Sequence, residues 1–574
     1  MSRTRTPVAR AAAARRSADP AEPLIQLRVD GADVEVADEG ASLLDVLREQ
    51  VGIRSVKDGC SPQGQCGCCT VWVDGAPRVS CVTPVRRLHG REVTTLDGMP
   101  EPERDRWAEA LVATGGSQCG FCTPGIVMRL AALAPDRSPR LPGADRPVVT
   151  SEAIDHALVA HLCRCTGWQS IGEAALRVFE EGHEPEGGRT PTRDLREAAA
   201  RAGLEGGVPQ RVGPTVVIGQ AGFADDTCPP GALVAVPDGA KGYAVAGSLG
   251  AARALAGKVQ GRSTSLALHH PITVPPGSWV LSLRTTWVEP AYVEPDASWC
   301  QPGGAPASSF GNGGAFGGKL HSPVMADARR LADEHDRPVR VLWSREDVVR
   351  YGPKRPPVAG GIDAGGTGLL RVGVSPGAVS DERWAEVTAR VSAVAPGLVL
   401  EQVPLPGPPI SFDLRAAVWA EAAVLATCAR VVGAEGSGAR YDVPVEVTAP
   451  SGGRAEARCR PDGSIAVTVD AGPVLDEVVL RSYCIGATHQ ALGWVRSEGI
   501  AVDELGAVRD LTVRSFGILQ ARAMPLVAVT IVSGAARAAV NGSDAVFAAV
   551  AAARWLADGL PPHWPTDRGG AGRR

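Results

Sequence analysis

Four cysteines between residues 60 and 81 have a spacing that could bind an iron–sulfur cluster. They are Cys60, Cys66, Cys69 and Cys81, which gives the pattern C-x5-C-x2-C-x11-C. A [2Fe–2S] cluster needs four thiolates, and plant-type ferredoxins supply three of them from one loop with C-x4-C-x2-C spacing. The loop here is one residue longer, and its glycines allow backbone N–H groups to point at sulfur. The pattern predicts a cluster, and the alternative is zinc, which usually takes two C-x2-C pairs.

Cys68 complicates the choice of the third ligand. The run C-G-C-C offers both Cys68 and Cys69. We assign Cys69, because only this choice keeps the x2 spacing after Cys66. Cys68 then has no assigned role.

A second group of four cysteines combines C-x2-C with C-x-C. Its members are Cys119, Cys122, Cys163 and Cys165. One pair precedes the helix-like segment 123–134 and the other precedes the segment 172–182, so a helical bundle could bring the four thiolates together. A single C-x2-C would be weak evidence, but both pairs after the first group indicate a second cluster. The five scattered cysteines are most simply buried small apolar residues: Cys228, Cys300, Cys428, Cys459 and Cys484.

The segments around the first group predict a small α+β domain over residues 23–100. Apolar and polar residues alternate on both sides of an Asp-Gly turn in 24–37 and again in 70–85, which predicts two hairpins. Between them, residues 41–52 have one apolar helical face, with Ser42 as a plausible N-cap. The first cysteine loop therefore joins a helix to a hairpin.

The rest of the chain divides into regions that differ in composition and in hydrophobic pattern. Residues 101–183 contain four amphipathic segments broken by Gly and Pro, which predicts a small four-helix domain. Residues 1–22 are expected to form a disordered arm, and residues 184–210, rich in Gly, Pro and Arg, a linker. Residues 211–574 mix strand-like and helical runs and predict one or two further α+β domains, split near 355–410.

The order of these motifs resembles the iron–sulfur region of the xanthine dehydrogenase and aldehyde oxidase family, the molybdenum hydroxylases. The motifs DGC...GQCGCCTVWVDG...SC, SQCGFCTPG and HLCRCTGWQSI carry the resemblance, which covers residues 24–182. It implies a β-grasp ferredoxin domain, a four-helix [2Fe–2S] domain, and contact of Gln118 with the pterin of a molybdenum cofactor. The sequence departs from the family at the extra residue before Cys66 and at Cys68, where the family commonly has a small residue.

Downstream, the resemblance to the molybdenum-binding part of the family is looser. RTTWVEPAYVEPDASWC, GNGGAFGGKL and RPVRVLWSREDVVRYGPKRPP follow in the family's order. The resemblance implies that five downstream residues approach the cofactor: Gly314, Ala315, Phe316 and Gly317 of the glycine loop, and Gln490 in the later segment GATHQALG. A structural glycine turn is the alternative for the loop, and a helix-surface position is the alternative for His489 and Gln490. The loop also matches G-x4-G-K of a phosphate loop, but Leu320 stands where Ser or Thr would bind Mg²⁺.

Two departures concern catalysis. A glutamate near the C-terminus acts as the base in the family, and Gly542-Ser543-Asp544 stands at the aligned position. Asp544 is therefore the candidate base, with a helix cap or first-turn position as the alternative. A full molybdenum subunit of the family is also roughly twice this length. Arg415 and Glu421 in LRAAVWAEAAV are possible remnants of a further family motif.

The composition sets the remaining expectations. The 574 residues suffice for about four domains of roughly 150 residues, and the net charge of -4 gives no electrostatic reason to expect nucleic acid as a partner. We find no apolar run of about 18 residues and no apolar segment of a signal peptide, so we expect no membrane span and a cytoplasmic protein.

The expected function is oxidation of a small molecule, an aldehyde or N-heterocycle, with water as the oxygen source. The expected cofactors are two [2Fe–2S] clusters and a molybdenum–molybdopterin cofactor. Since only a short segment separates residue 182 from the downstream region, a separate FAD-binding subunit or another acceptor would take the electrons. The alternative is an electron-transfer or scaffold subunit with two clusters and no functional molybdenum site.

Overall fold

The computed structural model describes residues 24–568 except for 39, 135–136, 138–147, 181–192, 240–241, 258–260, 262, 378, 437 and 534–537. The expected arm 1–22 and residues 184–192 of the expected linker lie outside the described residues.

The N-terminal domain is a five-stranded sheet of order β2-β1-β5-β3-β4 with one helical segment packed on it. Its elements are β1 (Leu24–Val29), β2 (Ala32–Ala37), α2 (Leu43–Asp45), its π-helical continuation η1 (Val46–Val51), β3 (Thr70–Val73), β4 (Ala76–Val79) and β5 (Glu92–Thr94). Strand β5 runs parallel to β1 and antiparallel to β3. The Ser42 hydroxyl accepts a hydrogen bond from Asp45 N, as expected of an N-cap. The expected β-grasp fold is confirmed.

The next domain is helical, as predicted from its amphipathic segments. Its four α-helices are α3 (Glu101–Thr114), α4 (Thr123–Ala131), α5 (Ser151–Ala157) and α6 (Gln169–Phe179). Helices α3 and α6 pack together, and α4 lies against β3 of the first domain. Cys122 directly precedes α4, and Cys163 and Cys165 lie in the connection before α6. Both pairs of the second cysteine group therefore face the same junction.

The remaining chain forms three four-stranded sheets with helices packed on them. The first sheet, of order β7-β6-β10-β9, contains β6 (Leu233–Pro237), β7 (Tyr243–Ala246), β9 (Ala297–Cys300) and β10 (Val339–Leu342). The second, of order β13-β12-β11-β8, contains β8 (Leu281–Arg284), β11 (Val358–Ile362), β12 (Gly368–Val374) and β13 (Leu398–Pro404). The third, of order β14-β15-β16-β17, contains β14 (Val445–Thr448), β15 (Arg454–Cys459), β16 (Ile465–Asp470) and β17 (Val527–Val532).

Ten further α-helices connect and cover these sheets within the described part of the chain. They are α7 (Leu195–Gly206), α8 (Pro214–Val217), α9 (Ala224–Thr227), α10 (Leu249–Ala256), α11 (Val324–His335), α12 (Arg345–Tyr351), α13 (Asp381–Val394), α14 (Trp419–Glu435), α15 (Glu477–Arg496) and α16 (Ser543–Ala557). Helix α7 lies in the segment expected to be a linker. Asp194 caps it by accepting from Arg196 N and Glu197 N, and its apolar face packs on α15. Part of the expected linker therefore forms a packed helix.

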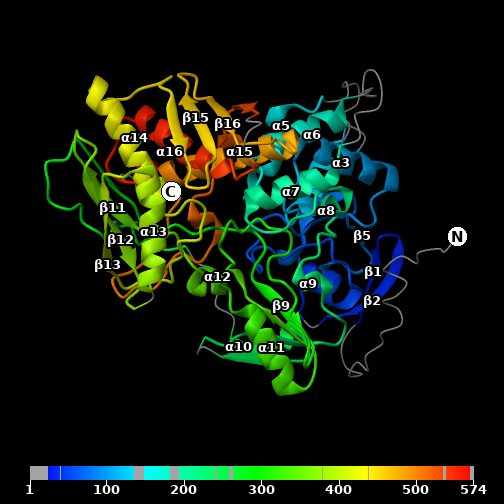
Figure 1. The fold of residues 1–574 in the computed structure, drawn as a ribbon. Helices are drawn as coiled ribbons and strands as arrows, with labels where there is room; N and C mark the ends of the chain where they lie inside the picture. Colours follow the sequence, from blue (N-terminus) through cyan, green and yellow to red (C-terminus); the bar gives the residue numbers. More distant parts are fainter. Residues whose placement is uncertain are drawn as a thin grey trace.

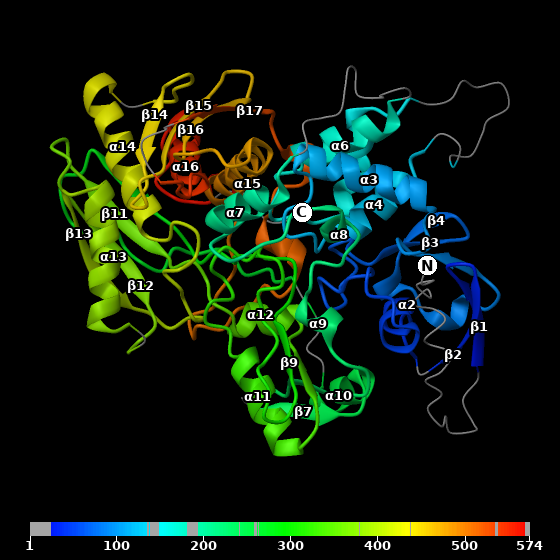
Figure 2. The ribbon, with the colours of Figure 1, turned by 45° about the vertical axis from the view of Figure 1, so that its right-hand side comes forward.

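The cluster domains and the later region share a continuous core. Buried residues of the first two domains pack with Trp287, Val293 and Phe516 of the later region. Both views of the ribbon show α7 lying beside α15, near the helical domain (Figures 1 and 2). Helices α15 and α16 pack along each other. This arrangement brings the second cysteine group to the interior of the molecule.

None of the helices that the structure describes combines the length and apolar character needed to cross a membrane.

Candidate functional site

The first four predicted cysteines lie together. Three come from the loop between η1 and β3, and the fourth from the 3-10 turn η2 (Ser80–Val82). All four are buried, and none is in a disulfide bond. The Cys60 thiol contacts the thiols of Cys66 and Cys81, and Cys81 also contacts Cys69. The hydrogen bonds from Cys66 and Cys81 hold the pKa of Cys60 well below its usual value.

The second group is brought together in the same way by the helical domain. The sulfurs of Cys119 and Cys165 are 3.6 Å apart, and the thiols of Cys122 and Cys163 are in contact. A hydrogen bond from Cys122 lowers the pKa of Cys163 to about 6, and Thr166 assists. Its hydroxyl oxygen lies 3.1 Å from the Cys163 sulfur. All four cysteines of this group are buried.

The pairing of the thiols suits a two-iron cluster better than zinc. Over residues 24–568 with the gaps given above, no group of three or more His, Cys, Asp or Glu side chains is arranged to hold a single metal ion. In the second group the thiols meet in two pairs, Cys119 with Cys165 and Cys122 with Cys163. A [2Fe–2S] cluster takes four thiolates, two on each of its irons.

The glycine loop after β9 lies directly on the second cysteine group. Gly314 has a φ of +82°, and a methyl group added to it would lie 2.9 Å from the sulfur of Cys119 and 3.2 Å from that of Cys165. At Gly317, with a φ of +92°, such a methyl group would lie 1.8 Å from the carbonyl oxygen of Asp413. Only glycine fits at these two positions. The loop therefore spans from the second cysteine group to the segment before Arg415.

The lysine of this loop is not free to bind phosphate. Lys319 is buried, and its Nζ lies 2.8 Å from Glu294 Oε2 and donates to Ser309 O at 3.0 Å. Since a phosphate loop needs its lysine to reach the phosphates, the phosphate-loop alternative does not fit this geometry.

Gln118 and Gln490 lie on two sides of the C-x-C pair. Gln118 Nε2 donates to Cys165 O at 3.1 Å and to Ser482 Oγ at 2.9 Å. Its Oε1 is buried without a hydrogen-bond partner. Gln490, on α15, donates from Nε2 to Arg164 O at 3.0 Å. Gln118 thus keeps an acceptor that a buried ligand could use.

The helix-surface alternative for residues 489 and 490 is wrong. His489 and Gln490 are both buried, 0% and 4% exposed, because α15 lies between α7, α16 and the helical domain. His489 Nε2 lies 2.9 Å from Leu519 O, and burial lowers the pKa of His489 to about 4.

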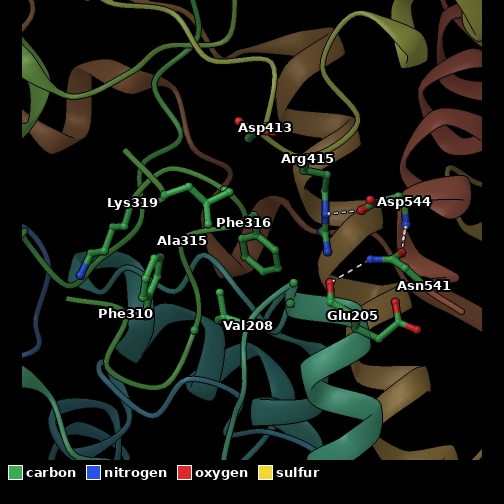
Figure 3. A pocket seen from close by; sticks show the side chains of 15 residues that line it. Glu205, Val208, Phe310, Ala315, Phe316, Lys319, Asp413, Arg415, Asn541 and Asp544 are labelled. Carbon is green, nitrogen blue, oxygen red and sulfur yellow. Dashed lines mark hydrogen bonds and ion pairs between the residues drawn. The ribbon is translucent and has the colours of Figure 1, made fainter. Parts of the chain in front are cut away.

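A cavity of about 110 Å³ lies beside the glycine loop. Its lining residues are Glu205, Gly206, Gly207, Val208, Phe310, Gly313, Ala315, Phe316, Gly317, Lys319, Leu320, Asp413, Arg415, Asn541 and Asp544. Figure 3 shows Arg415 extending between the Phe316 ring and Asp544. The Arg415 guanidinium lies 4.1 Å from the centre of the Phe316 ring. The structure thus brings three of the predicted site residues, Ala315, Phe316 and Gly317, to the same cavity as Asp544.

Asp544 lies in the first turn of α16 and faces Arg415. Arg415 Nε donates to Asp544 Oδ1 at 3.1 Å, and Arg415 Nη2 donates to Ser543 Oγ at 3.0 Å. Burial raises the pKa of Asp544, while Arg415 opposes this shift. Arg415 Nη1 is buried without a hydrogen-bond partner. The Asp544 carboxylate is paired with a cation and does not cap the helix.

Helix α16 is capped by Asn541, whose Oδ1 accepts from Asp544 N at 2.9 Å, and by Glu205, a residue that the sequence did not point to. Its carboxylate accepts hydrogen bonds from Gly542 N and Ser543 N, the latter at 2.9 Å, and pairs with Arg201 at 3.0 Å. Glu205 and Arg201 are both buried. The i, i+4 spacing of Arg201 and Glu205, with Asp194 before and two glycines after, could have predicted helix α7.

These two cysteine groups define the class of the protein, an iron–sulfur protein with two [2Fe–2S] domains. Residues 27–87 match the model of the 2Fe-2S iron-sulfur cluster binding domain, and residues 95–176 match the model of the [2Fe-2S] binding domain.

Two bacterial relatives assign the chain to a narrower family. It is 40% identical over 138 residues to the xanthine dehydrogenase iron-sulfur-binding subunit of Escherichia coli O157:H7, covering 24% of this chain and 81% of that one. It is 37% identical over 147 residues to the nicotinate dehydrogenase small FeS subunit of Eubacterium barkeri, covering 25% and 87%. The chain belongs to the xanthine dehydrogenase and aldehyde oxidase family, the molybdenum hydroxylases.

The fold of the whole chain has counterparts among solved structures. The aldehyde oxidoreductase of Desulfovibrio gigas superposes with a TM-score of 0.68 at 15% identity, covering 95% of this chain and 99% of that one. The aldehyde oxidoreductase of Desulfovibrio desulfuricans gives a TM-score of 0.59 at 14% identity, covering 92% and 97%. The region after residue 211 therefore shares the fold of these enzymes.

The polar groups around the loop fit a molybdenum cofactor. Gln118 Oε1 has no hydrogen-bond partner and could accept a hydrogen bond from an N–H group of a pterin. Arg415 Nη1 has no partner either and could donate a hydrogen bond to an acceptor atom of the pterin. Both atoms are buried, and a buried polar atom without a partner destabilises the structure unless a ligand completes it. Gln118, the backbone of Gly314 to Gly317, and Arg415 are thus the residues that would hold the cofactor.

Proposed function

We propose that the chain is the iron–sulfur and molybdenum-binding subunit of an oxidoreductase that oxidises an aldehyde or N-heterocycle with water as the oxygen source. The observation that carries the proposal is the contact of Gly314 with Cys119 and Cys165, because it joins the loop of the substrate cavity to the second cluster. When bound, the molybdenum cofactor would supply two-electron oxidation, and the two clusters would relay single electrons from it to an external acceptor.

The chain's own residues have distinct parts in this proposal. The second cysteine group lies against the glycine loop of the cavity, and the first has an exposed neighbour in the sequence. Val82, directly after Cys81, is 58% exposed, and a methyl group on Gly64 would meet its side chain at 3.0 Å. We propose that electrons leave here, toward a separate FAD-binding subunit. Eight free thiols in two clusters suit a reducing compartment, and we therefore propose the cytoplasm.

At the cavity, Asp544 is the proposed proton acceptor. Its carboxylate lies against Arg415, which offsets part of the cost of a negative charge at this half-buried position. The Phe316 ring covers the other face of the Arg415 guanidinium and holds it in place. Asp544 can therefore take a proton from a water molecule or a substrate in the cavity.

A second candidate function is favoured by the size of the cavity. Pockets that bury a small organic ligand usually have about 300–1,000 Å³. The cavity here has about 110 Å³. In this second function the chain transfers electrons through two clusters without molybdenum.

Metal analysis of the purified chain, produced in a host that makes the molybdenum cofactor, separates the two functions. The first predicts four irons and about one molybdenum per chain, and a Gln118→Leu variant that keeps its iron but loses most of its molybdenum. Gln220→Leu, on the surface, serves as the control and should keep both metals. Four irons without molybdenum in the unmodified chain would reject the first function and leave the second.

A further inference from the structure

The segment that supplies the fourth cysteine of the first group is basic. Residues 76–91, which include Cys81, contain four arginines and neither aspartate nor glutamate. The whole chain, in contrast, has a net charge of -4. This segment is therefore positive on a chain that is negative overall.

Three of the four arginines stand at the surface. Arg78 lies on β4, and Arg86 and Arg87 lie in the 3-10 turn η3 (Val85–Arg87). All three are exposed, and none of their side chains makes a hydrogen bond or an ion pair with another residue that the structure describes. The fourth, Arg91, pairs with an aspartate at the tip of the β3–β4 hairpin.

These arginines lie on both sides of Val82, the exposed residue directly after Cys81. A methyl group on Gly64 would meet the Val82 side chain at 3.0 Å, so the loop between Cys60 and Cys66 lies against it. The surface at Val82 is thus formed by the two segments that hold the first cysteine group.

A further exposed arginine reaches the same loop from a distant part of the chain. Arg514 lies in the 3-10 turn η5 (Val513–Phe516), and its backbone N donates to Gln65 Oε1 at 3.0 Å. Gln65 directly precedes Cys66. We call the set Arg78, Val82, Arg86, Arg87 and Arg514 the arginine surface.

The exposed acids described within residues 24–100 lie away from these arginines or beside other ones. Asp33 and Glu35 are on β2, at the opposite edge of the sheet from β4. The other three each lie beside an arginine outside the arginine surface: Glu49 by Arg340, Asp74 by Arg91, and Glu92 by Arg28.

We propose that the arginine surface is the docking surface for an electron-acceptor protein with an acidic surface. The proposal rests on the relay proposed above, in which electrons leave from the first cluster. In each encounter one electron passes from the reduced cluster to the acceptor, which oxidises the cluster and reduces the acceptor. Complementary charge speeds such encounters and orients them, and salt weakens the effect.

The test offers the chain one electron carrier in two charge forms. The iron-loaded chain, reduced by dithionite, is mixed with native cytochrome c, which is basic, or with succinylated cytochrome c, which is acidic. At about 10 mM salt, succinylated cytochrome c should reoxidise the clusters about tenfold faster than the native form, and the difference should vanish near about 500 mM salt. The net charge of the chain alone would give the opposite preference.

A pair of double variants separates the arginine surface from overall charge. Arg86→Glu with Arg87→Glu should keep four irons per chain and reverse the preference at low salt. Arg454→Glu with Arg460→Glu makes the same change of charge at exposed arginines on β15 and directly after it, and it should leave the preference unchanged.

Three results would overturn the proposal. They are equal rates of the two cytochrome forms at low salt, faster reaction of the native form, and equal effects of the two double variants. The first two need only the unmodified chain. Since dithionite reduces the clusters directly, a chain without molybdenum or turnover would reject the proposed oxidation and still show the charge preference.

Discussion

Gly314 lies so close to Cys119 that a single methyl group between them would be 2.9 Å from the cysteine sulfur. The two residues are almost 200 positions apart in the sequence, and they join the loop of the cavity to the second cluster group. Substitution of Gly314 therefore probes both regions at once.

Gly314→Ala should lower the free energy of unfolding by about 1–3 kcal/mol, since it adds a methyl group to a packed site. It should also change the electron paramagnetic resonance signal of the second cluster but not that of the first. The matched control is Gly303→Ala, which has a similar φ of +69° but open space at the Cβ position. If Gly314→Ala and Gly303→Ala changed the signal of the second cluster equally, the close contact between Gly314 and that cluster group would be contradicted.

The buried ion pair of Arg355 and Glu421 should matter for stability. Arg355 Nε and Nη2 each donate to one carboxylate oxygen of Glu421 at 2.8 Å, and the guanidinium lies 4.1 Å from the centre of a Trp494 ring. Removal of one partner of a buried pair costs about 3–5 kcal/mol. Glu421→Gln should show a loss of this order in chemical denaturation. Glu401→Gln, which breaks the more exposed pair with Arg371, should cost less than about 1 kcal/mol, and similar losses would refute the argument.

Burial of His161 should make the junction of the first two domains sensitive to acid. His161 packs against Gly67, and burial lowers its pKa from 6.5 to about 3, with Arg129 assisting. The unfolded chain therefore binds more protons below pH 6.5, and stability is lost as the pH falls toward 3. When the pH falls from 7.5 to 5.5, protonation of His161 in the unfolded chain should lower the free energy of unfolding by about 1.4 kcal/mol. His161→Gln should reduce the pH dependence of the unfolding free energy by this amount, and an unchanged dependence would count against it.

Asp544 should be required for turnover but not for the clusters. Asp544→Ala should keep both electron paramagnetic resonance signals and lose activity toward a panel of aldehydes and N-heterocycles. Because burial raises the pKa of Asp544, activity should fall on the acid side at a higher pH than for an ordinary aspartate. Unchanged turnover in Asp544→Ala would remove Asp544 as the base. Asp413→Ala, which removes another carboxylate that lines the cavity, serves as the comparison.

The cluster cysteines could be predicted because their information is local. Three ligands of the first group lie within one loop, and each pair of the second group lies next to a helix, so spacing and periodicity were sufficient. The contacts of the cavity are different. Gln118 bonds to Ser482 across 364 residues, and Glu205 bonds to Gly542 across 337 residues. No local pattern predicts such pairs, because they depend on how α7, α15 and α16 pack.

A reductive titration followed by electron paramagnetic resonance with spin integration shows whether these eight cysteines hold two clusters in one chain. We expect two distinct signals of about one spin each per chain, of which Cys163→Ser abolishes one and Cys69→Ser the other. A single signal, a total of about one spin, or retention of both signals in Cys163→Ser would contradict this expectation.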